Sequence, residues 1–280
     1  MTGSPASLAG VSMPYSTDDY TALDRPELVR FVFYPRRDFT DPPPGAVDHL
    51  VTVDAAVAVS CRFYVHDRES PTILFFHGNG EVVSDYDYVA PIYSSQAGAN
   101  LFVADYRGYG ASGGSPTFSS MVADAHRVFK DFLAIRQEGG HSGGIFVMGR
   151  SLGSVSAIEL ASRCQDSVDG LIVESGFAST VRLMSRLGFP RDFLGIQDFG
   201  FPNLSRIRTV TLPTLIIHAE RDSLIPLEEG KDLFANVPAQ EKRLVVIPEA
   251  GHNDIMMADM PAYFGAIREF IIRPDRVGRP

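Results

Sequence analysis

Apolar residues recur along this chain in short runs. Two runs near the N-terminus, residues 28–36 and 56–66, alternate apolar and polar positions as strands do. Six continuous apolar runs follow, at residues 72–78, 100–108, 144–149, 170–176, 214–220 and 243–249. Continuous runs are typical of strands in a parallel sheet, because helices cover both faces of such a sheet.

Helical patterns lie between these runs. In residues 119–136 the apolar positions form one stripe, and residues 227–237 and 261–272 predict two later helices. This alternation predicts an α/β fold, with a mostly parallel sheet of about eight strands flanked by helices and joined by right-handed crossovers. In such sheets the chemistry lies at the carboxyl ends of the strands.

Length and composition limit the classes of protein to consider. A chain of 280 residues that is 45% hydrophobic suits one large core, so we expect residues 28–280 to form a single domain behind a poorly ordered arm, residues 1–27. The net charge of −9 argues against binding to nucleic acid. No apolar run approaches the roughly 20 residues of a membrane span. No signal peptide is evident, so we expect a cytoplasmic protein without stable membrane insertion.

The cysteines and the patterns of metal-ligating residues indicate neither a redox site nor a metal site. Cys61 and Cys164 fit no metal or redox spacing and lie in apolar segments, so we expect buried, reduced thiols. No H-E-x-x-H or comparable ligand cluster occurs, so the sequence predicts no metal site.

A serine between glycines is the first candidate for chemistry. The pattern G-x-S-x-G occurs at residues 110–114, 140–144 and 149–153, but only Ser151 has a predicted strand before it and a helix after it. Glycines two residues before and after let the strand and helix approach closely. We therefore interpret Ser151 as a nucleophile, with the N–H of Leu152 at the helix start available to an oxyanion.

A serine nucleophile needs a base, and the base needs an orienting acid. Of seven histidines, His252 stands directly after the last predicted strand and before the last helix. Asp222 lies past the end of the preceding strand, with Glu220 and Glu174 as reserves. The order serine, aspartate, histidine is that of α/β-hydrolases.

The segment after the first continuous run completes the predicted site. Gly78 permits a sharp turn after the strand, so the N–H of Asn79 can face a reacting carbonyl and form the oxyanion hole together with Leu152. We expect His77 to brace this loop rather than to transfer a proton.

Several motifs stand along the chain: FHGNG, DYRGYGASGGSP at residues 105–116, GRSLGS, FPN at 201–203, LIIHAERDSLIP and AGHND. With this set the chain resembles the α/β-hydrolase superfamily, and more closely the lid-poor α/β-hydrolase-domain proteins of the depalmitoylase-like and serine-aminopeptidase-like branch. The resemblance implies serine hydrolysis through an acyl-enzyme without a cofactor, and it implies that Asp105 and Arg107 brace the rim of the site. Two features depart from it: HAE replaces the usual His-Gly before the acid, and the N-terminal cysteine cluster of the depalmitoylases is missing.

Substrate choice stays open at this point. Residues 177–213 are rich in apolar side chains and predict one or two short helices that form a low lid over a shallow acyl pocket. We expect a small-molecule ester, thioester or other acyl substrate. An aminopeptidase-like amide hydrolase would use the same three residues, but it usually needs an acidic group for the substrate amine, and only Glu81 is a candidate. A non-catalytic binding protein on a hydrolase scaffold is the alternative from a different class.

Overall fold

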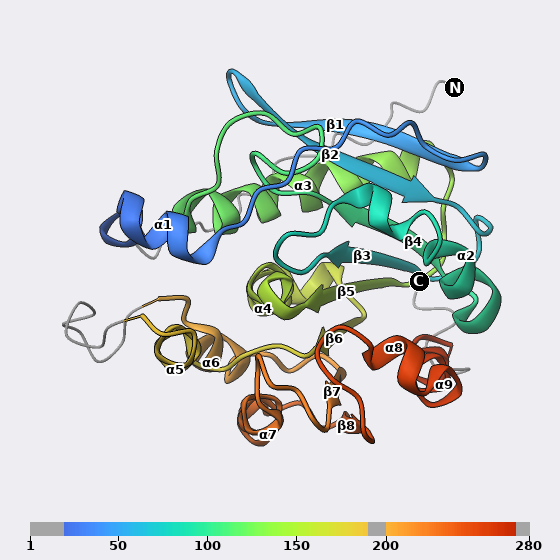
Figure 1. The fold of residues 1–280 in the computed structure, drawn as a ribbon. Coiled ribbons are helices and arrows are strands. Elements are labelled where there is room, and N and C mark those ends of the chain that lie inside the picture. Colours follow the sequence, from blue (N-terminus) through green and yellow to red (C-terminus); the bar gives the residue numbers. More distant parts are fainter. Residues whose placement is uncertain (1–19, 190–199, 273–280) are drawn as a thin grey trace, which may run out of the picture.

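A central sheet of eight strands organises the protein in a computed structural model that describes residues 20–189 and 200–272 (Figure 1). The strand order is β1-β2-β4-β3-β5-β6-β7-β8. The pairs β1–β2 and β2–β4 are antiparallel, and all the others are parallel. The strands are β1 Ala46–Asp54, β2 Val57–Tyr64, β3 Thr72–Phe76, β4 Asn100–Ala104, β5 Ile145–Arg150, β6 Gly170–Glu174, β7 Thr214–Ala219 and β8 Lys242–Ile247. This confirms the predicted fold class.

Helices cover both faces of the sheet, which explains why the central strands are continuously apolar. The helices are α1 Pro26–Val32, α2 Ala90–Ile92, α3 Phe118–Glu138, α4 Ser154–Arg163, α5 Thr180–Arg186, α6 Asn203–Ile207, α7 Leu227–Asn236, α8 Ile255–Ala258 and α9 Met260–Ile271. Side chains of α1 and α3–α7 pack into one core, and those of α2, α8 and α9 into the other. Every residue of β3, β4, β6 and β7 is buried.

The N-terminal part of the chain corrects two expectations. The strand predicted at residues 28–36 is wrong, because α1 occupies Pro26–Val32 and an extended segment follows it. Pro26 supplies the reason: its fixed φ suits the first turn of a helix, and Glu27 favours the positive end of the helix dipole. Tyr20 and Leu23 are buried in the core, so the packed part of the chain begins before residue 28. Residues 1–19 of the predicted arm lie outside the described residues.

The edge strand β1 is a strand that the apolar pattern does not predict. It pairs with β2 over most of its length, and Val47 and Leu50 are exposed on it. Because polar residues such as Asp48 and His49 interrupt its apolar positions, the period-two signal is weak. Pairing with a neighbouring strand, which is a tertiary property, decides this element.

Residues 177–213, the predicted lid, contain the short helices α5 and α6 in their described parts. Phe177, Met184 and Phe201 are buried in the core below them, while Leu187 is exposed. Phe193, Leu194 and Phe199 of the same prediction lie outside the described residues. Most of the described aromatic and aliphatic side chains therefore pack on the sheet side, and a covering role for this segment stays a prediction.

A buried ionic cluster joins α3, α4 and α6. Glu159 on α4 accepts contacts from His126 Nε2 at 3.1 Å and from Arg206 Nε at 2.7 Å, and Arg163 lies 3.6 Å away. Burial by itself would raise the pKa of Glu159, but the hydrogen bond from His126 and the charge of Arg206 outweigh it and lower that pKa. The ionised carboxylate thus stabilises the packing of three helices.

Glu159→Gln is expected to lower the melting temperature at pH 7. Because the pKa of Glu159 is lower in the fold than its ordinary value of about 4.3, its contribution is fully present above that value and is lost as the pH falls through the folded pKa. Thermal unfolding followed by circular dichroism should show the gap between wild type and variant closing below about pH 4. Glu138→Gln, at an exposed position of α3, is the control. A gap that stays constant with pH would contradict the assignment.

Candidate active site

A tight elbow joins β5 to α4 and presents Ser151. The strand ends at Arg150, a 3-10 turn covers Ser151–Gly153, and α4 begins at Ser154. Ser151 has φ of +52°, a left-handed conformation that costs an L-residue about 1–3 kcal/mol. A Cβ on Gly149 would lie 2.3 Å from the carbonyl oxygen of Gly153, so the strand and the helix approach too closely for a side chain there.

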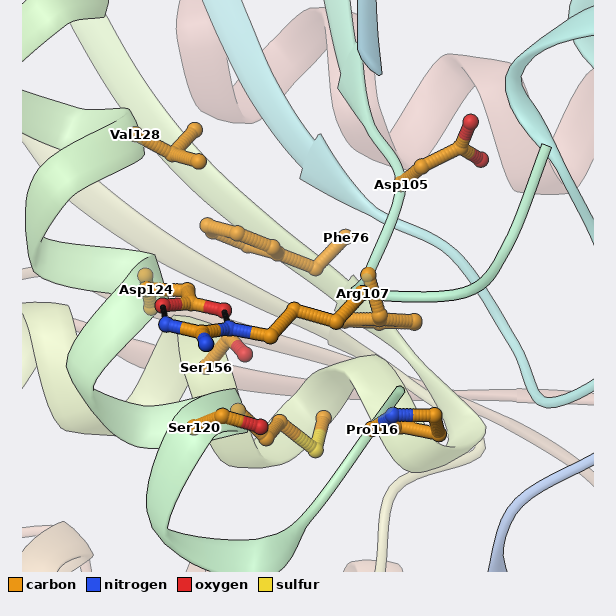
Figure 2. Close-up of a pocket in the computed structure, with 11 residues that line it drawn as sticks. Phe76, Asp105, Arg107, Pro116, Ser120, Asp124, Val128 and Ser156 are labelled. Atoms are coloured by element: carbon orange, nitrogen blue, oxygen red, sulfur yellow. Dashed lines mark hydrogen bonds and ion pairs between the residues drawn. The ribbon is translucent and has the colours of Figure 1, made fainter. Parts of the chain in front are cut away.

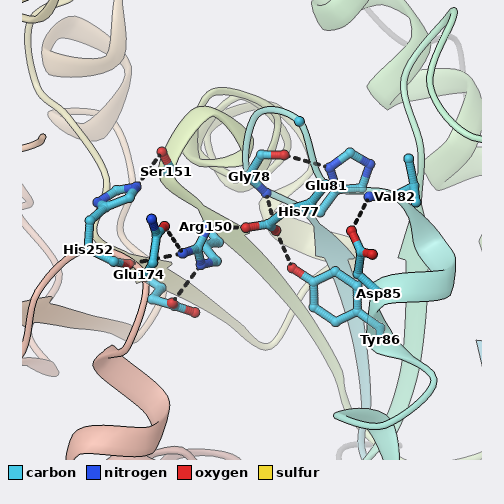
Figure 3. Close-up of polar contacts among 12 residues, drawn as sticks. His77, Gly78, Glu81, Val82, Asp85, Tyr86, Arg150, Ser151, Glu174 and His252 are labelled. Carbon is cyan, nitrogen blue, oxygen red and sulfur yellow. Dashed lines mark hydrogen bonds and ion pairs between the residues drawn. The ribbon is translucent and has the colours of Figure 1, made fainter. Parts of the chain in front are cut away.

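Three predicted residues from three strand ends meet at this elbow. His252 Nε2 lies 3.1 Å from Ser151 Oγ, and His252 Nδ1 lies 2.7 Å from Asp222 Oδ2. All three side chains are buried, with residue exposures of 6–8%. The other oxygen of Asp222 accepts the backbone N–H groups of Leu224 and Ile225 at 3.0 and 2.7 Å, which fixes the carboxylate. Figure 3 shows the His252 ring turned toward Ser151.

The charge on Asp222 follows from the same contacts. Burial would raise the pKa of Asp222, but the hydrogen bond and charge of His252 outweigh it and lower that pKa. His218, another buried histidine near Asp222, is held instead by the carbonyl of Ile225 at 2.8 Å. Burial lowers the pKa of His218, which favours its neutral form.

The two reserve acids lie elsewhere. Glu220 is exposed, and its side chain accepts the N–H of Glu249 at 2.9 Å. Glu174, at the end of β6, accepts from Arg150 and from the hydroxyl of Tyr263. Asp222 alone of these three carboxylates contacts the His252 ring.

The loop after β3 is braced as predicted. His77 Nε2 lies 3.1 Å from Asp105 Oδ1, and its Nδ1 lies 2.8 Å from the carbonyl oxygen of Gly78. Burial would lower the pKa of His77, but Asp105 outweighs it and raises that pKa, in keeping with a ring that donates to both acceptors. The ring is fully buried, so bracing rather than proton transfer fits its surroundings.

Asn79 follows this brace, and its side chain is anchored on both sides. Its Nδ2 donates to the carbonyl of Val32 at 2.6 Å, and its Oδ1 accepts from Tyr34 N–H and Tyr109 hydroxyl. Among residues 20–189 and 200–272, no hydrogen-bond acceptor contacts the backbone N–H of Asn79 or of Leu152. These two donors therefore remain available to a ligand.

The two residues expected to brace the rim have separate roles. Asp105 contacts His77 and also accepts the N–H of Val83 at 3.0 Å, so it does support the loop. Arg107 instead forms a two-pronged ion pair with Asp124 of α3 (Figure 2). Both residues line a cavity of about 10 Å³, which is too small for a substrate group. Arg107 thus fastens the loop after β4 to α3, away from the three clustered residues.

Arg150 is a residue of this site that the sequence reasoning missed. It directly precedes Ser151, and its guanidinium lies between the carboxylates of Glu81 and Glu174 (Figure 3). The signal that could have revealed it is a charged residue at the end of an otherwise apolar strand. A charged side chain at a buried strand end is costly unless it is paired, so an arginine in this position indicates acidic partners nearby.

One cavity borders the elbow at Arg150, and a second lies between other elements. One, of about 270 Å³, is lined by Arg150, Glu81 and Glu174 with apolar side chains of α8. The other, of about 260 Å³, lies between α5 and the start of α7 and includes Leu183 and Ile225. Neither lining includes Ser151, Asp222 or His252.

Within the described ranges, no group of three or more histidine, cysteine or acidic side chains is arranged to hold a metal ion. Over the same residues, every helix is too short or too polar to cross a bilayer.

The chain is similar in sequence to known proteins. Residues 67–205 and 181–257 match a family model described as serine aminopeptidase, S33. The human α/β hydrolase domain-containing protein 17B is 31% identical over 218 residues, which cover 76% of this chain and 70% of that protein. Protein bem46 of Schizosaccharomyces pombe is 29% identical over 209 residues, covering 73% and 68%.

Solved structures show the same fold. An esterase of Pyrococcus furiosus superposes with a TM-score of 0.70 at 19% identity and covers 88% of this chain and 98% of its own. The esterase Est1E of Butyrivibrio proteoclasticus, solved with ferulic acid, gives a TM-score of 0.62 at 17% identity, covering 79% and 97%. By sequence and by fold, this chain belongs to the α/β-hydrolase superfamily and is a hydrolase.

Proposed function

We propose that the protein is a serine hydrolase that cleaves an ester or thioester of a small-molecule or acyl substrate through an acyl-enzyme. The observation that carries the proposal is the continuous contact from Ser151 through His252 to Asp222, at 3.1 and 2.7 Å. These distances lie within the range for proton transfer between a nucleophile, its base and the orienting acid.

The first half-reaction follows from this arrangement. His252 Nε2 takes the proton of Ser151 as the hydroxyl oxygen attacks the substrate carbonyl carbon. Asp222 holds the imidazole in the tautomer with a proton on Nδ1 and stabilises the imidazolium that forms. The N–H groups of Asn79 and Leu152 would hold the oxyanion; loss of one such donor typically costs about 3 kcal/mol of transition-state stabilisation.

The second half-reaction regenerates the enzyme. The imidazolium of His252 gives its proton to the leaving alcohol or thiol as the tetrahedral intermediate collapses to the acyl-enzyme. A water molecule then loses a proton to His252 and attacks the acyl carbon, which releases the acid and restores Ser151. No step requires a cofactor or a metal.

An aminopeptidase-like amide hydrolase is the second candidate, and the matched family model is described by that activity. Such an enzyme needs an acidic group free to bind the substrate amine. Glu81, the candidate from the sequence, already accepts from Arg150, from Gly78 N–H and from the hydroxyl of Tyr86. These contacts occupy both of its oxygens, so we favour the ester or thioester.

The free cysteines and the net charge indicate the cellular compartment and the class of substrate. Both Cys61 and Cys164 are free and buried, and burial raises the pKa of each thiol, which makes them unreactive. Reduced thiols and a net charge of −9 fit an enzyme that acts in the cytoplasm on a small molecule rather than on nucleic acid.

Trapping of the acyl-enzyme tests the proposal. A fluorophosphonate probe should modify the tryptic peptide of residues 151–163, which begins at Ser151 because trypsin cleaves after Arg150. A graded series of p-nitrophenyl esters and acyl thioesters should be hydrolysed faster than aminoacyl p-nitroanilides. Faster turnover of the anilides would favour the aminopeptidase, and a complete lack of labelling and turnover would favour a binding protein.

A further inference from the structure

Arg150, the residue before the proposed nucleophile, uses all three of its guanidinium nitrogens inside the protein. Nε donates to Glu174 at 3.1 Å, Nη1 donates to Glu81, and Nη2 donates to the carbonyl of His252 at 2.9 Å and to the side chain of Asn253 at 3.2 Å. Its side chain is only 12% exposed. It therefore contacts the main chain of the histidine loop directly.

The contact with Glu81 extends this link to the loop after β3. The second oxygen of Glu81 accepts the N–H of Gly78 at 2.8 Å and the hydroxyl of Tyr86 at 2.7 Å. A Cβ on Gly78 would lie 2.5 Å from Arg150 Nη1, so the guanidinium packs against backbone that only glycine leaves open. One side chain thus joins the elbow of Ser151, the histidine loop and the loop that carries Asn79 (Figure 3).

The charges of this bridge persist despite burial. Burial would raise the pKa of Glu81, but the charge of Arg150 outweighs it, and the pKa of Glu81 is lowered. Burial would likewise lower the pKa of Arg150, but the two carboxylates hold it above its usual range. Removal of one partner leaves an uncompensated buried charge, so the bridge resists opening.

A cavity lies beside the Arg150 bridge, so the loops on that side depend more on the ionic contacts of Arg150. The cavity has a volume of about 270 Å³ and lies against Arg150, Glu81, Glu174 and Asn253. In most of a protein interior close-packed side chains hold the loops in place, but on this side the loops face open space. The ionic contacts therefore carry the positioning that packing supplies elsewhere.

We propose that Arg150 is a positioning residue that fixes the His252 loop and the Asn79 loop relative to Ser151. The inference rests on the proposed serine hydrolase function. Arg150 acts through the carbonyl of His252 and through Glu81, and it leaves the reacting atoms untouched. Misplacement of a reacting group by about 1 Å can cost about a hundredfold in rate, so loss of the bridge should reduce the chemical step more than substrate binding.

Kinetics on p-nitrophenyl acetate test this role with matched variants. Arg150→Gln should lower kcat by about tenfold to a hundredfold and change KM by less than about twofold. Arg150→Lys keeps the charge with fewer donors and should recover part of kcat. Glu81→Gln should also lower kcat. In the double variant Arg150→Gln with Glu81→Gln, kcat should lie within about twofold of kcat in the less active single variant, because the two residues act as one bridge.

Arg62 supplies the control. It pairs with Asp48 and Asp87, so it is also an arginine between two carboxylates, and its side chain is 2% exposed against 12% for Arg150. It lies on β2, which β4 and β3 separate from β5. Arg62→Gln should lower the melting temperature and leave kcat of the folded protein unchanged.

The outcomes separate this inference from the proposed function. Wild-type kcat in Arg150→Gln and in Glu81→Gln, alongside normal labelling of Ser151, would overturn the positioning role alone. Lack of turnover and labelling in the wild type would overturn the proposed function and the inference with it. If Arg150→Gln does not fold, Arg150→Lys and Glu81→Gln decide the question: wild-type kcat in both refutes the role, and reduced kcat with little change in KM supports it.

Discussion

Replacement of Ser151 by alanine is expected to abolish ester hydrolysis and fluorophosphonate labelling while the protein stays folded. The serine hydroxyl is the proposed attacking atom, and loss of such a nucleophile from an acting triad costs on the order of 10⁶-fold in kcat. Alanine at this position keeps the size of the elbow nearly unchanged, so the melting temperature should stay close to that of the wild type. Steady-state turnover of p-nitrophenyl acetate, in-gel labelling and circular dichroism measure these three quantities.

The chain contains its own control for this experiment. Ser142 lies in the same G-x-S-x-G pattern, but it is exposed and precedes β5 instead of following it. Ser142→Ala should therefore retain wild-type turnover and labelling. Strong labelling of Ser151→Ala would place the nucleophile elsewhere and refute the assignment of Ser151.

Gly153→Ala is expected to damage both stability and activity. A Cβ at this position would lie 2.0 Å from the carbonyl oxygen of Phe76 and 2.8 Å from that of His77. Both atoms are backbone, so the elbow and β3 must move apart, and overpacking of this kind typically costs about 1–3 kcal/mol. The loop that carries Asn79 follows directly, so kcat/KM should also fall by about a hundredfold. Thermal unfolding and ester kinetics measure the two effects.

Gly265→Ala serves as the matched glycine control. Gly265 lies inside α9, and a Cβ there would meet no atom within 4 Å. Alanine is the better helix former, so this variant should gain about 0.5–1 kcal/mol of stability and keep full activity. Equal melting temperatures and equal activity for Gly153→Ala and the wild type would show that the β5–α4 elbow tolerates a side chain, against the argument for its tightness.

Much of the fold follows from the sequence because the central strands are covered on both faces. Runs such as residues 72–78 and 214–220 consist mostly of apolar residues, with only a few polar ones such as Thr72 and Thr214, so their pattern identifies β3 and β7 directly. The edge strand of the sheet and the N-terminal segment are harder to predict from the sequence. Residues 28–36 alternate like a strand, yet Pro26 starts a helix there, and β1 has a weak pattern because its partner β2 stabilises it.

The candidate site divides in the same way. The sequence by itself determined the order of Ser151, Asp222 and His252 at strand ends, because parallel strands bring their carboxyl ends to one edge of the sheet. The tertiary structure alone decided that Asp222, rather than Glu220 or Glu174, contacts the imidazole. It also decided the bridge of Arg150, whose partners lie 69 residues before it and 102 residues after it. Such contacts depend on how distant loops pack at one edge, and local residue patterns carry no information about that packing.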